Sequence, residues 1–373
     1  MKKYKYSWQL LCAAFVMLAI SCKKTDQGPS IDDYFLNYPI PEIPVTQDYV
    51  IGAFYYQWGT FNANIKQIPV VGPYTAPSGK EPDTIMAKHI DQAVYGGVDY
   101  FLFAIRSWNK DNGGFKSDST LIDVFTRQNT EGKMKFALSY NFNAGSYGIT
   151  TTNPLENDAV KLGQFLNDME RLAPFFSNPN YQKVNGKTLL YITNSHQMYS
   201  NDNPSIYKSI RERLSALGFD LYIVGNQERW SPAARYPFRF KNCVDAIYQQ
   251  SYSSGLSDWD KWYLLPQEMD QAWKYNRKYF ADSMNIDYIP NITPAYSWKI
   301  SNPSSVNPEY PRTDSGKIYR TLCNVAKMNA SAQTRLILVD SYNKFDEDTQ
   351  LEPAESYGNL YLDITKQEFK KPQ

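Results

Sequence analysis

The sequence predicts an α/β protein built as a (β/α)8 TIM barrel, and three observations support that fold class. Strand-like apolar runs alternate with segments of helical period along residues 47–373, and together they make eight strand–helix units. Ionisable and aromatic side chains follow the predicted strand ends, where barrel enzymes place their active sites. No low-complexity segment or linker interrupts this stretch, so one large domain is expected.

The eight strands are predicted from short runs rich in β-branched, aromatic and leucine residues, which suit parallel strands buried on both faces. These runs are residues 49–56, 98–105, 136–142, 188–192, 221–224, 244–249, 288–292 and 336–339. Helical spacing covers residues 84–95, 121–128, 157–172, 205–217, 259–282, 317–329 and 355–369, with a weaker piece near Ala233. A doubly wound open sheet is the alternative, but it often has a glycine-rich first turn, which this chain lacks.

The N-terminus predicts export. Residues 1–21 combine three lysines with an apolar run that is too short to span a bilayer, which is typical of a signal peptide. Ser21-Cys22 resembles a bacterial lipoprotein cleavage site, although Leu18 lies one position too far away, and ordinary cleavage nearby is the alternative. We expect residues 22–46 to form a tether lipidated at Cys22. The predicted location is the cell envelope, with a lipid anchor, on the periplasmic or the surface side.

Charge and cysteine usage exclude several functions. Without residues 1–21 the chain carries 36 basic and 38 acidic residues and has no basic stripe, so a nucleic-acid partner is not expected. Cys243 and Cys323 could pair in an oxidising compartment or stay as buried thiols. The chain has only two histidines and no metal-ligand spacing, phosphate-binding loop or nucleophile triad, so we expect neither metal nor cofactor. The oligomeric state is not predicted.

A family resemblance comes from the stretch after the last predicted strand. Asn343-Lys344-Phe345-Asp346-Glu347-Asp348, then Leu351-Glu352-Pro353 and Tyr357-Gly358, resembles the Asn-Glu-Trp-x-Glu-Gly, Glu-Pro and Tyr-Gly pattern of glycoside hydrolase family 99-like, WbsX-type domains. Ser139-Tyr-Asn-Phe-Asn143 lies where that family often has Trp-Ala-Asn-Glu-Asn. Acids of the family pattern are therefore replaced by Lys344 and Phe142.

The resemblance implies a (β/α)8 barrel that cleaves glycans in an endo manner. It also implies that Glu347 is the general acid/base, and that a base three residues earlier deprotonates the sugar's own 2-hydroxyl to give an anhydro-sugar. Lys344 occupies that earlier position, and a cation cannot act as that base unless burial strongly lowers its pKa. A lysine close to Glu347 would also favour the ionised carboxylate, which is the wrong state for a general acid.

Replacement carboxylates are available at other strand ends. Glycosidic hydrolysis uses two groups, one to protonate the leaving oxygen and one to supply or activate a nucleophile. Glu228 follows the fifth predicted strand and Asp340 ends the eighth, so with Glu347 they are the candidate catalytic residues. The alternatives are a salt bridge of Glu228 with Arg229 or Arg235, and a structural hydrogen bond for Asp340.

Ligand contacts are predicted from aromatic and polar residues near strand ends, since sugar rings pack on aromatic faces and their hydroxyls need hydrogen-bond partners. The candidates are Tyr55, Tyr56, Trp58, Asn141, Trp230, Tyr248, Asn343, Lys344 and Glu352. We expect Tyr56, Asn141, Glu228, Tyr248, Asp340 and Glu347 to face one cleft.

Two functions from different classes follow. The first is a cell-envelope glycoside hydrolase-like protein that acts on an oligo- or polysaccharide without a cofactor. The second is a catalytically inactive glycan-binding lipoprotein with the same cleft, which the Lys344 and Phe142 substitutions favour. A glycosyltransferase is a minor third possibility, because WbsX-type domains have been associated with polysaccharide synthesis. The predicted export and the lack of a nucleotide-phosphate motif argue against it.

Overall fold

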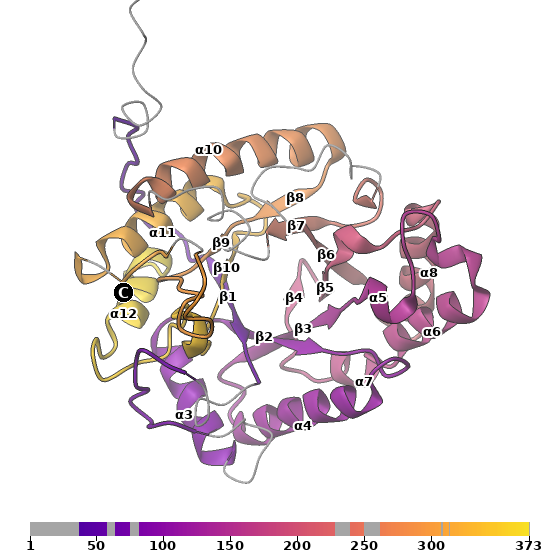
Figure 1. Cartoon of the computed structure of the whole chain (residues 1–373), viewed down its shortest axis with the longest axis horizontal. Helices are drawn as coiled ribbons and strands as arrows, with labels where there is room; N and C mark the ends of the chain where they lie inside the picture. Colours follow the sequence, from indigo (N-terminus) through magenta and orange to yellow (C-terminus); the bar gives the residue numbers. More distant parts are fainter. Residues whose placement is uncertain are drawn as a thin grey trace, which may run out of the picture. The chain divides into compact units, whose positions relative to one another are not determined.

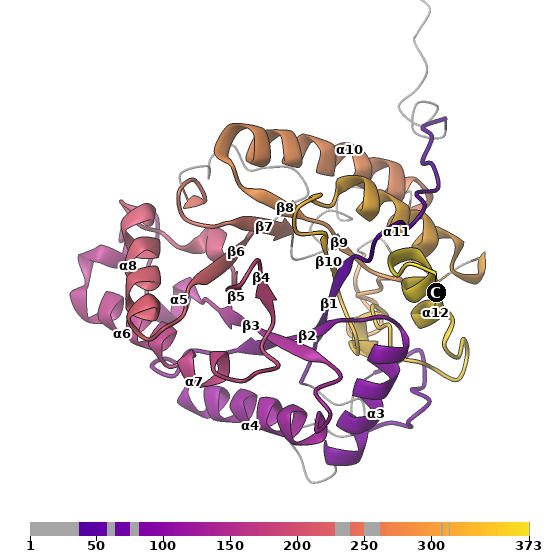
Figure 2. The same ribbon diagram turned by 180° about the vertical axis from the view of Figure 1, so that it is seen from behind.

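The computed structural model describes residues 37–57, 64–74, 82–227, 239–249, 262–306, 309–312 and 314–372. Residues Ile40–Gln373 form one compact unit, and this unit contains the barrel. Parallel strands line its centre, and helices surround them on the outside (Figure 1; Figure 2 from behind). The part of the chain that the structure describes has no helix that is long and apolar enough to cross a membrane.

The strands follow one another around the barrel almost in sequence order. They are β1 Val50–Tyr55, β2 Tyr100–Ile105, β3 Lys135–Asn141, β5 Lys187–Thr193, β6 Leu221–Gln227, β7 Ala246–Gln249, β8 Asp287–Ile289, β9 Asn291–Ile292 and β10 Leu336–Val339. Each of these pairs in parallel with its neighbours, while the short β4, Lys183–Val184, pairs antiparallel with β5.

The barrel closes through an interrupted strand. β8 pairs with β7, β9 pairs with β10, and only Pro290 separates β8 from β9. Proline has no backbone N–H to give to a ladder, but its carbonyl accepts from the Leu338 N–H at 2.9 Å. β10 then pairs with β1, Val50 lying opposite Leu336. With β8 and β9 counted as one strand, the described residues give eight barrel positions, and the predicted (β/α)8 barrel is confirmed.

The helices pack on the outside of the strands. They are α3 Pro82–Tyr95, α4 Asn112–Gln128, α5 Ala144–Tyr147, α6 Ala159–Glu170, α7 Ala173–Phe176, α8 Asn203–Ala216, α10 Leu265–Arg277, α11 Lys317–Asn329 and α12 Leu360–Phe369. Short 3-10 turns span Leu155–Asn157, Ser195–Gln197, Trp262–Leu264, Asp314–Gly316 and Phe345–Glu347 (η7), and a π turn spans Lys278–Asp282. The helical piece predicted near Ala233 lies outside the described residues.

Helix α4 is longer than its sequence pattern predicts. Helical spacing begins only at Leu121, whereas the helix begins at Asn112. Its first turn contains Gly113 and Gly114, which are poor helix formers, so local propensity hides the start. The Asp111 side chain compensates as the N-cap, because it accepts a hydrogen bond of 2.8 Å from the Gly114 N–H.

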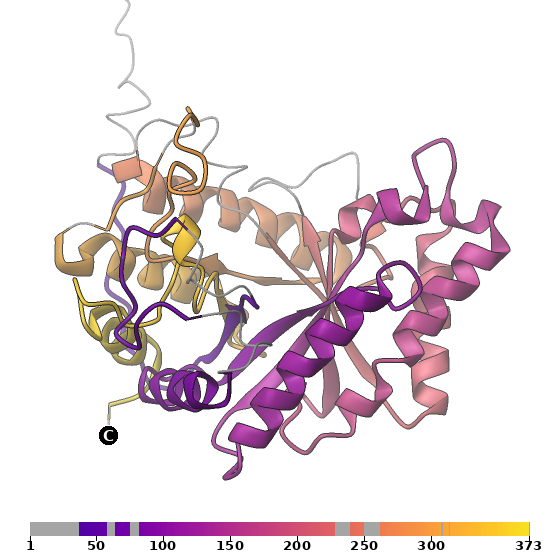
Figure 3. The ribbon, with the colours of Figure 1, turned by 60° about the horizontal axis from the view of Figure 1, so that its bottom comes forward.

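Side chains fill the barrel interior. Gly52 on β1 faces Tyr100 on β2, and a Cβ at Gly52 would lie 2.2 Å from the Tyr100 ring, so only glycine fits there. The Tyr100 and Tyr191 hydroxyls are 2.8 Å apart, and nearer the carboxyl ends the Ser139 and Thr193 hydroxyls are 2.5 Å apart. Because the centre is packed, a ligand site has to lie at the rim. Figure 3 shows the loop after β9 and the turn after β10 at the same end of the barrel.

The two cysteines within the described residues stay separate. Cys243, before β7, and Cys323, in α11, are both buried and free. Burial raises the pKa of the Cys243 thiol to about 12, so it is not a reactive thiolate at neutral pH. The sequence left open whether Cys243 and Cys323 form a disulfide or stay as buried thiols, and in the structure they are buried thiols.

Candidate active site at the carboxyl end of β10

The turn that follows β10 is held by hydrogen bonds across its base. The Ser341 N–H donates to the Thr349 carbonyl at 3.1 Å, and the Leu351 N–H donates to the Ser341 carbonyl at 2.9 Å. The Ser341 hydroxyl also accepts from the Lys344 N–H at 2.8 Å. These bonds present η7, with Glu347 at its end, above the carboxyl end of β10.

Asp340 ends β10 and meets Tyr56, which follows β1. The Tyr56 hydroxyl donates to Asp340 Oδ1 at 3.2 Å. Burial raises the pKa of the Asp340 carboxyl from 3.8 to about 7; nearby Lys344 opposes this shift, Glu347 adds to it and the Tyr56 hydrogen bond opposes it. Asp340 therefore carries a proton on a large fraction of molecules near neutral pH.

Lys344 and Glu347 form an ion pair on the same turn. The Lys344 Nζ lies 2.5 Å from Glu347 Oε1, and the two side chains are 17% and 15% exposed. The same ammonium lies 4.8 Å from the centre of the Tyr56 ring, a cation–π contact. Tyr56, Asp340, Lys344 and Glu347 thus form one group at the barrel rim, which we call the rim cluster.

Asn343 positions Tyr56. Its Oδ1 accepts from the Tyr56 N–H at 2.7 Å, and its Nδ2 donates to the Tyr56 carbonyl at 2.8 Å. Asn343 itself is only 1% exposed. The amide therefore fixes the backbone next to the rim cluster, and we assign it this positioning role rather than the ligand contact expected from the sequence.

Tyr55 and Glu352 lie behind the barrel wall. Glu352 Oε1 is 3.1 Å from His89 Nε2, both side chains being fully buried, and Glu352 Oε2 accepts from the Tyr74 hydroxyl at 2.8 Å. The Tyr55 hydroxyl and His89 Nδ1 are 2.8 Å apart. These contacts tie β1 and the turn after β10 to helix α3. The polar groups of Tyr55 and Glu352 face the helix layer, and we assign them a structural role there. Their ligand contacts stay predictions, and Tyr55 also contributes to the lining of the cavity at the mouth of the barrel.

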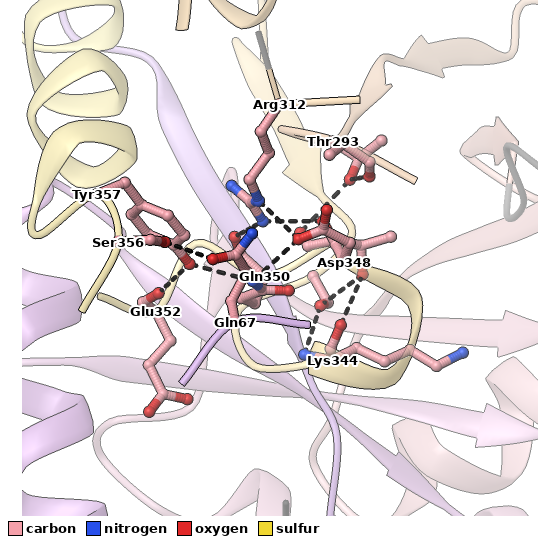
Figure 4. A network of polar contacts seen from close by, with 12 residues as sticks. Gln67, Thr293, Arg312, Lys344, Asp348, Gln350, Glu352, Ser356 and Tyr357 are labelled. Carbon is pink, nitrogen blue, oxygen red and sulfur yellow. Dashed lines mark hydrogen bonds and ion pairs between the residues drawn. The ribbon is translucent and has the colours of Figure 1, made fainter. Parts of the chain in front are cut away.

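Asp348, at the position of the family's glycine, keeps the backbone conformation that favours glycine. Its φ is 57°, in the left-handed region, which aspartate tolerates better than most residues. Arg312 stabilises it: its Nε donates to Asp348 Oδ1 at 2.8 Å, and its Nη2 donates to the carbonyls of Asp348 and Gln350 (Figure 4). The guanidinium also lies over the rings of Tyr357 and Tyr361. Sequence reasoning missed Arg312, because no local pattern links it to a residue 36 positions later.

A small cavity lies at the mouth of the barrel beside the rim cluster. Its volume is about 140 Å³, and its lining includes Phe54, Tyr56, Ser139 and Asn141. Tyr248 on β7 is buried below, with its ring centre 5.8 Å from that of Phe54. The structure thus brings Tyr56, Asn141, Tyr248, Asp340 and Glu347 to one end of the barrel, while Trp58, Glu228 and Trp230 lie outside the described residues.

Phe142, which replaces a family acid, points into the helix layer. It is fully buried, with ring centres 5.7 Å from Tyr147 in α5 and 5.4 Å from Phe165 in α6. This position adds apolar packing outside the barrel and contributes no charge to the rim. The described residues contain no group of acidic, histidine and cysteine side chains that could hold a metal ion.

Comparisons with known proteins match this fold and this motif. A model of the family described as "Glycosyltransferase WbsX" matches residues 152–365. A solved structure described as a "Glycoside hydrolase-like protein" is 30% identical, with a TM-score of 0.81 over 91% of this chain and 99% of that chain. No curated protein matches.

More distant structures share the barrel. The GH99 endo-alpha-mannosidase from Bacteroides thetaiotaomicron is 17% identical, with a TM-score of 0.62 over 86% of this chain and 96% of that chain. A GH5_18 protein from Bifidobacterium longum subsp. longum is 10% identical, with a TM-score of 0.54 over 86% and 79%. At these identities they show the fold alone. The family match over more than half of the chain, with the 30% identical structure, shows that this chain belongs to the WbsX family and has a glycoside hydrolase family 99-like barrel.

Proposed function

We propose that this protein is a glycoside hydrolase that cleaves an oligo- or polysaccharide at the cell envelope, with Asp340 and Glu347 as its catalytic carboxyl groups. The observation that carries the proposal is the rim cluster itself. It places two carboxyls at the carboxyl end of a barrel strand, and one of them has a pKa of about 7. Two acids whose environments differ in this way suit the separate acid and base tasks of glycosidic cleavage.

The surroundings of the two carboxyls suggest which group does what. Asp340, whose carboxyl has a pKa of about 7, would donate its proton to the glycosidic oxygen as the bond from the anomeric carbon to that oxygen breaks. Glu347, whose carboxylate contacts the Lys344 ammonium, would accept the proton of the attacking hydroxyl. Glu347 then takes only the base part of the acid/base role that the family resemblance implies, and Asp340 is the proton donor.

Lys344 sets this protein apart from the family route. A carboxylate at this position would deprotonate the sugar's 2-hydroxyl, whereas Lys344 presents an ammonium that is already paired with Glu347. We propose that Lys344 orients Glu347 and that its contact with the Tyr56 ring fixes this orientation. The attacking hydroxyl would then belong to water, so no anhydro-sugar would form.

A second candidate function rests on the same ion pair. If Lys344 holds Glu347 through the whole binding cycle, the rim cluster binds a glycan without cleaving it. Tyr56 and Asn141 at the cavity would then contribute to affinity, and Asp340 would hydrogen-bond a sugar hydroxyl. Hydrolysis comes first because the 30% identical structure is described as glycoside hydrolase-like.

A glycan panel separates the two functions. We expect the wild-type mature domain to release reducing ends from at least one glycan, and Glu347→Gln to lower kcat at least about a hundredfold while binding is retained. Asp346→Asn, on the same partly buried turn, is the matched control and should change kcat less than threefold. Binding without any turnover by the wild type would favour the glycan-binding protein, and full turnover by Glu347→Gln would remove Glu347 from the mechanism.

The envelope location has its own test. If Cys22 is lipidated, the protein should fractionate with membranes, and Cys22→Ser should release it or block its maturation. Mass spectrometry of the mature N-terminus should find acyl chains on Cys22. Recovery of the unmutated protein as a soluble, unacylated chain would contradict this prediction and leave the catalytic proposal untouched.

A further inference from the structure

A second hollow lies beside the rim cluster, across the turn after β10. Its volume is about 410 Å³, within the range of roughly 300–1,000 Å³ common for small-ligand pockets. Asp348 forms part of its lining, and so does Ser297, whose N–H donates to the Glu347 carbonyl at 2.8 Å. The Ser301 hydroxyl bonds the Asp346 carbonyl at 2.7 Å. The loop after β9 thus forms the hollow and also packs on the turn that carries Glu347.

The charges in this hollow leave a positive surplus. Lys66 and Lys299 both contribute to the lining, and Lys299 Nζ lies 2.9 Å from Glu309 Oε2. A hydrogen bond from the Ser297 hydroxyl and the two lysines lower the pKa of Glu309, so it is ionised and balances one lysine. Asp348 is already paired with the buried Arg312. Among the described lining residues one lysine charge therefore remains, and Lys66 is exposed.

The walls of the hollow suit a sugar ring. Trp262 is partly buried and forms part of the lining. Opposing backbone bonds of 2.7 and 2.8 Å between Tyr296 and Tyr310 hold the loop in a fixed shape, and both of these side chains are buried. An aromatic wall packs against the C–H face of a pyranose, while lysines select a charged substituent.

We propose that this hollow is a subsite for a sugar residue that carries an anionic group, a carboxylate or a sulfate, in the same glycan that reaches Asp340 and Glu347. This assignment rests on the proposed function, which places the cleaved bond of the glycan at the rim cluster. A glycan that spans both hollows must cross the turn after β10. The substrate class that we infer from this subsite is an acidic polysaccharide. The subsite also favours internal cleavage, because sugar residues would be held beyond the rim cluster.

The test measures binding rather than turnover, in the full mature chain with Glu347→Gln so that no ligand is consumed. Calorimetric titration would compare oligosaccharides of equal length that are neutral, uronate-containing or sulfated. We expect acidic ligands to bind at least about tenfold more tightly than neutral ones, with affinity falling as salt rises. Lys66→Gln should remove most of this preference. Lys208→Gln, at an exposed lysine on α8, is the matched control and should leave it intact.

The outcomes separate the subsite from the catalytic proposal. Preference for only one acidic ligand would identify the anionic group as carboxylate or sulfate. Equal binding of neutral and acidic ligands, an acidic preference that survives Lys66→Gln, or no binding at all would overturn the subsite. Cleavage of neutral glycans by the wild type would leave the hydrolase proposal standing in those cases. If Lys66→Gln loses the preference for acidic ligands and the wild type shows no turnover, the subsite is supported and the hydrolase proposal is contradicted.

Discussion

Asp340→Asn is expected to lower kcat by about a hundred- to ten-thousandfold, because the asparagine amide cannot donate the proton that the leaving oxygen needs. In the wild type, kcat/KM should fall as pH rises above about 7, the pKa of the Asp340 carboxyl in the free protein. Steady-state rates between pH 5 and 9 on the best glycan of the panel would measure both effects. Wild-type activity that stays constant from pH 6 to pH 9 would contradict the assignment of Asp340 as the acid.

Tyr56→Phe is the matched variant for this prediction. In the wild type the Tyr56 hydroxyl donates to Asp340, and this hydrogen bond lowers the pKa of the Asp340 carboxyl. The loss of the hydroxyl should therefore move the alkaline limb of the pH–rate profile to higher pH. A structural defect would lower the rate at every pH without moving the limb.

The same carboxyl gives a readout that does not depend on activity. The folded pKa of Asp340 exceeds its ordinary value of 3.8, so wild-type stability should fall as pH rises from about 4 to about 7. Asp340→Asn should lose this part of the pH dependence, which denaturant titrations at both ends of the range would detect.

Glu352→Ala is expected to destabilise the fold by about 2–5 kcal/mol, because each buried polar group that loses its partner costs about 1–3 kcal/mol. Glu352 is fully buried against His89, and the variant would also leave the Tyr74 hydroxyl without its acceptor. Urea unfolding of the mature domain, with midpoint and slope compared, measures the change.

Glu355→Ala is the control for this variant. Glu355 is exposed three residues further along the same loop, and its loss should change the free energy of unfolding by less than about 0.5 kcal/mol. If Glu352→Ala were as stable as Glu355→Ala, the buried pair with His89 would contribute nothing to the fold, and our structural assignment of Glu352 would be wrong.

The strands were predictable because each depends on a short local signal. Apolar runs such as Leu336–Val339 are buried on both faces of the barrel wall, so their composition alone marks them. Helix starts were less predictable, as α4 shows, because a single capping residue outweighs two glycines. Even the break at Pro290 did not hide its strand, since Tyr288, Ile289 and Ile292 around it are apolar.

The site was predictable only where position along the chain determined it. Asp340 ends the last strand and Glu347 lies in the turn that follows it, so the sequence predicts both side chains at the same end of the barrel. Glu352 follows the same strand, but its partner His89 lies 263 residues earlier, and no local pattern shows that the two are buried together. For the same reason the sequence could not show that Arg312 supports Asp348 in its left-handed conformation.

The position of β10 near the end of the chain has a consequence for the order in which the barrel wall can form. Until β10 is available, β1 and β9 are open edges. β1 pairs with β2 on one side and with β10 on the other, and β9 pairs with β10 alone. When β10 inserts, the Asp340 N–H bonds the Ile292 carbonyl and the Tyr342 N–H bonds the Phe54 carbonyl. The last step of wall assembly is then also the step that creates the rim cluster. A chain that stops short of β10 has neither a closed wall nor the rim cluster, so the candidate site forms only once the C-terminal segment has been made.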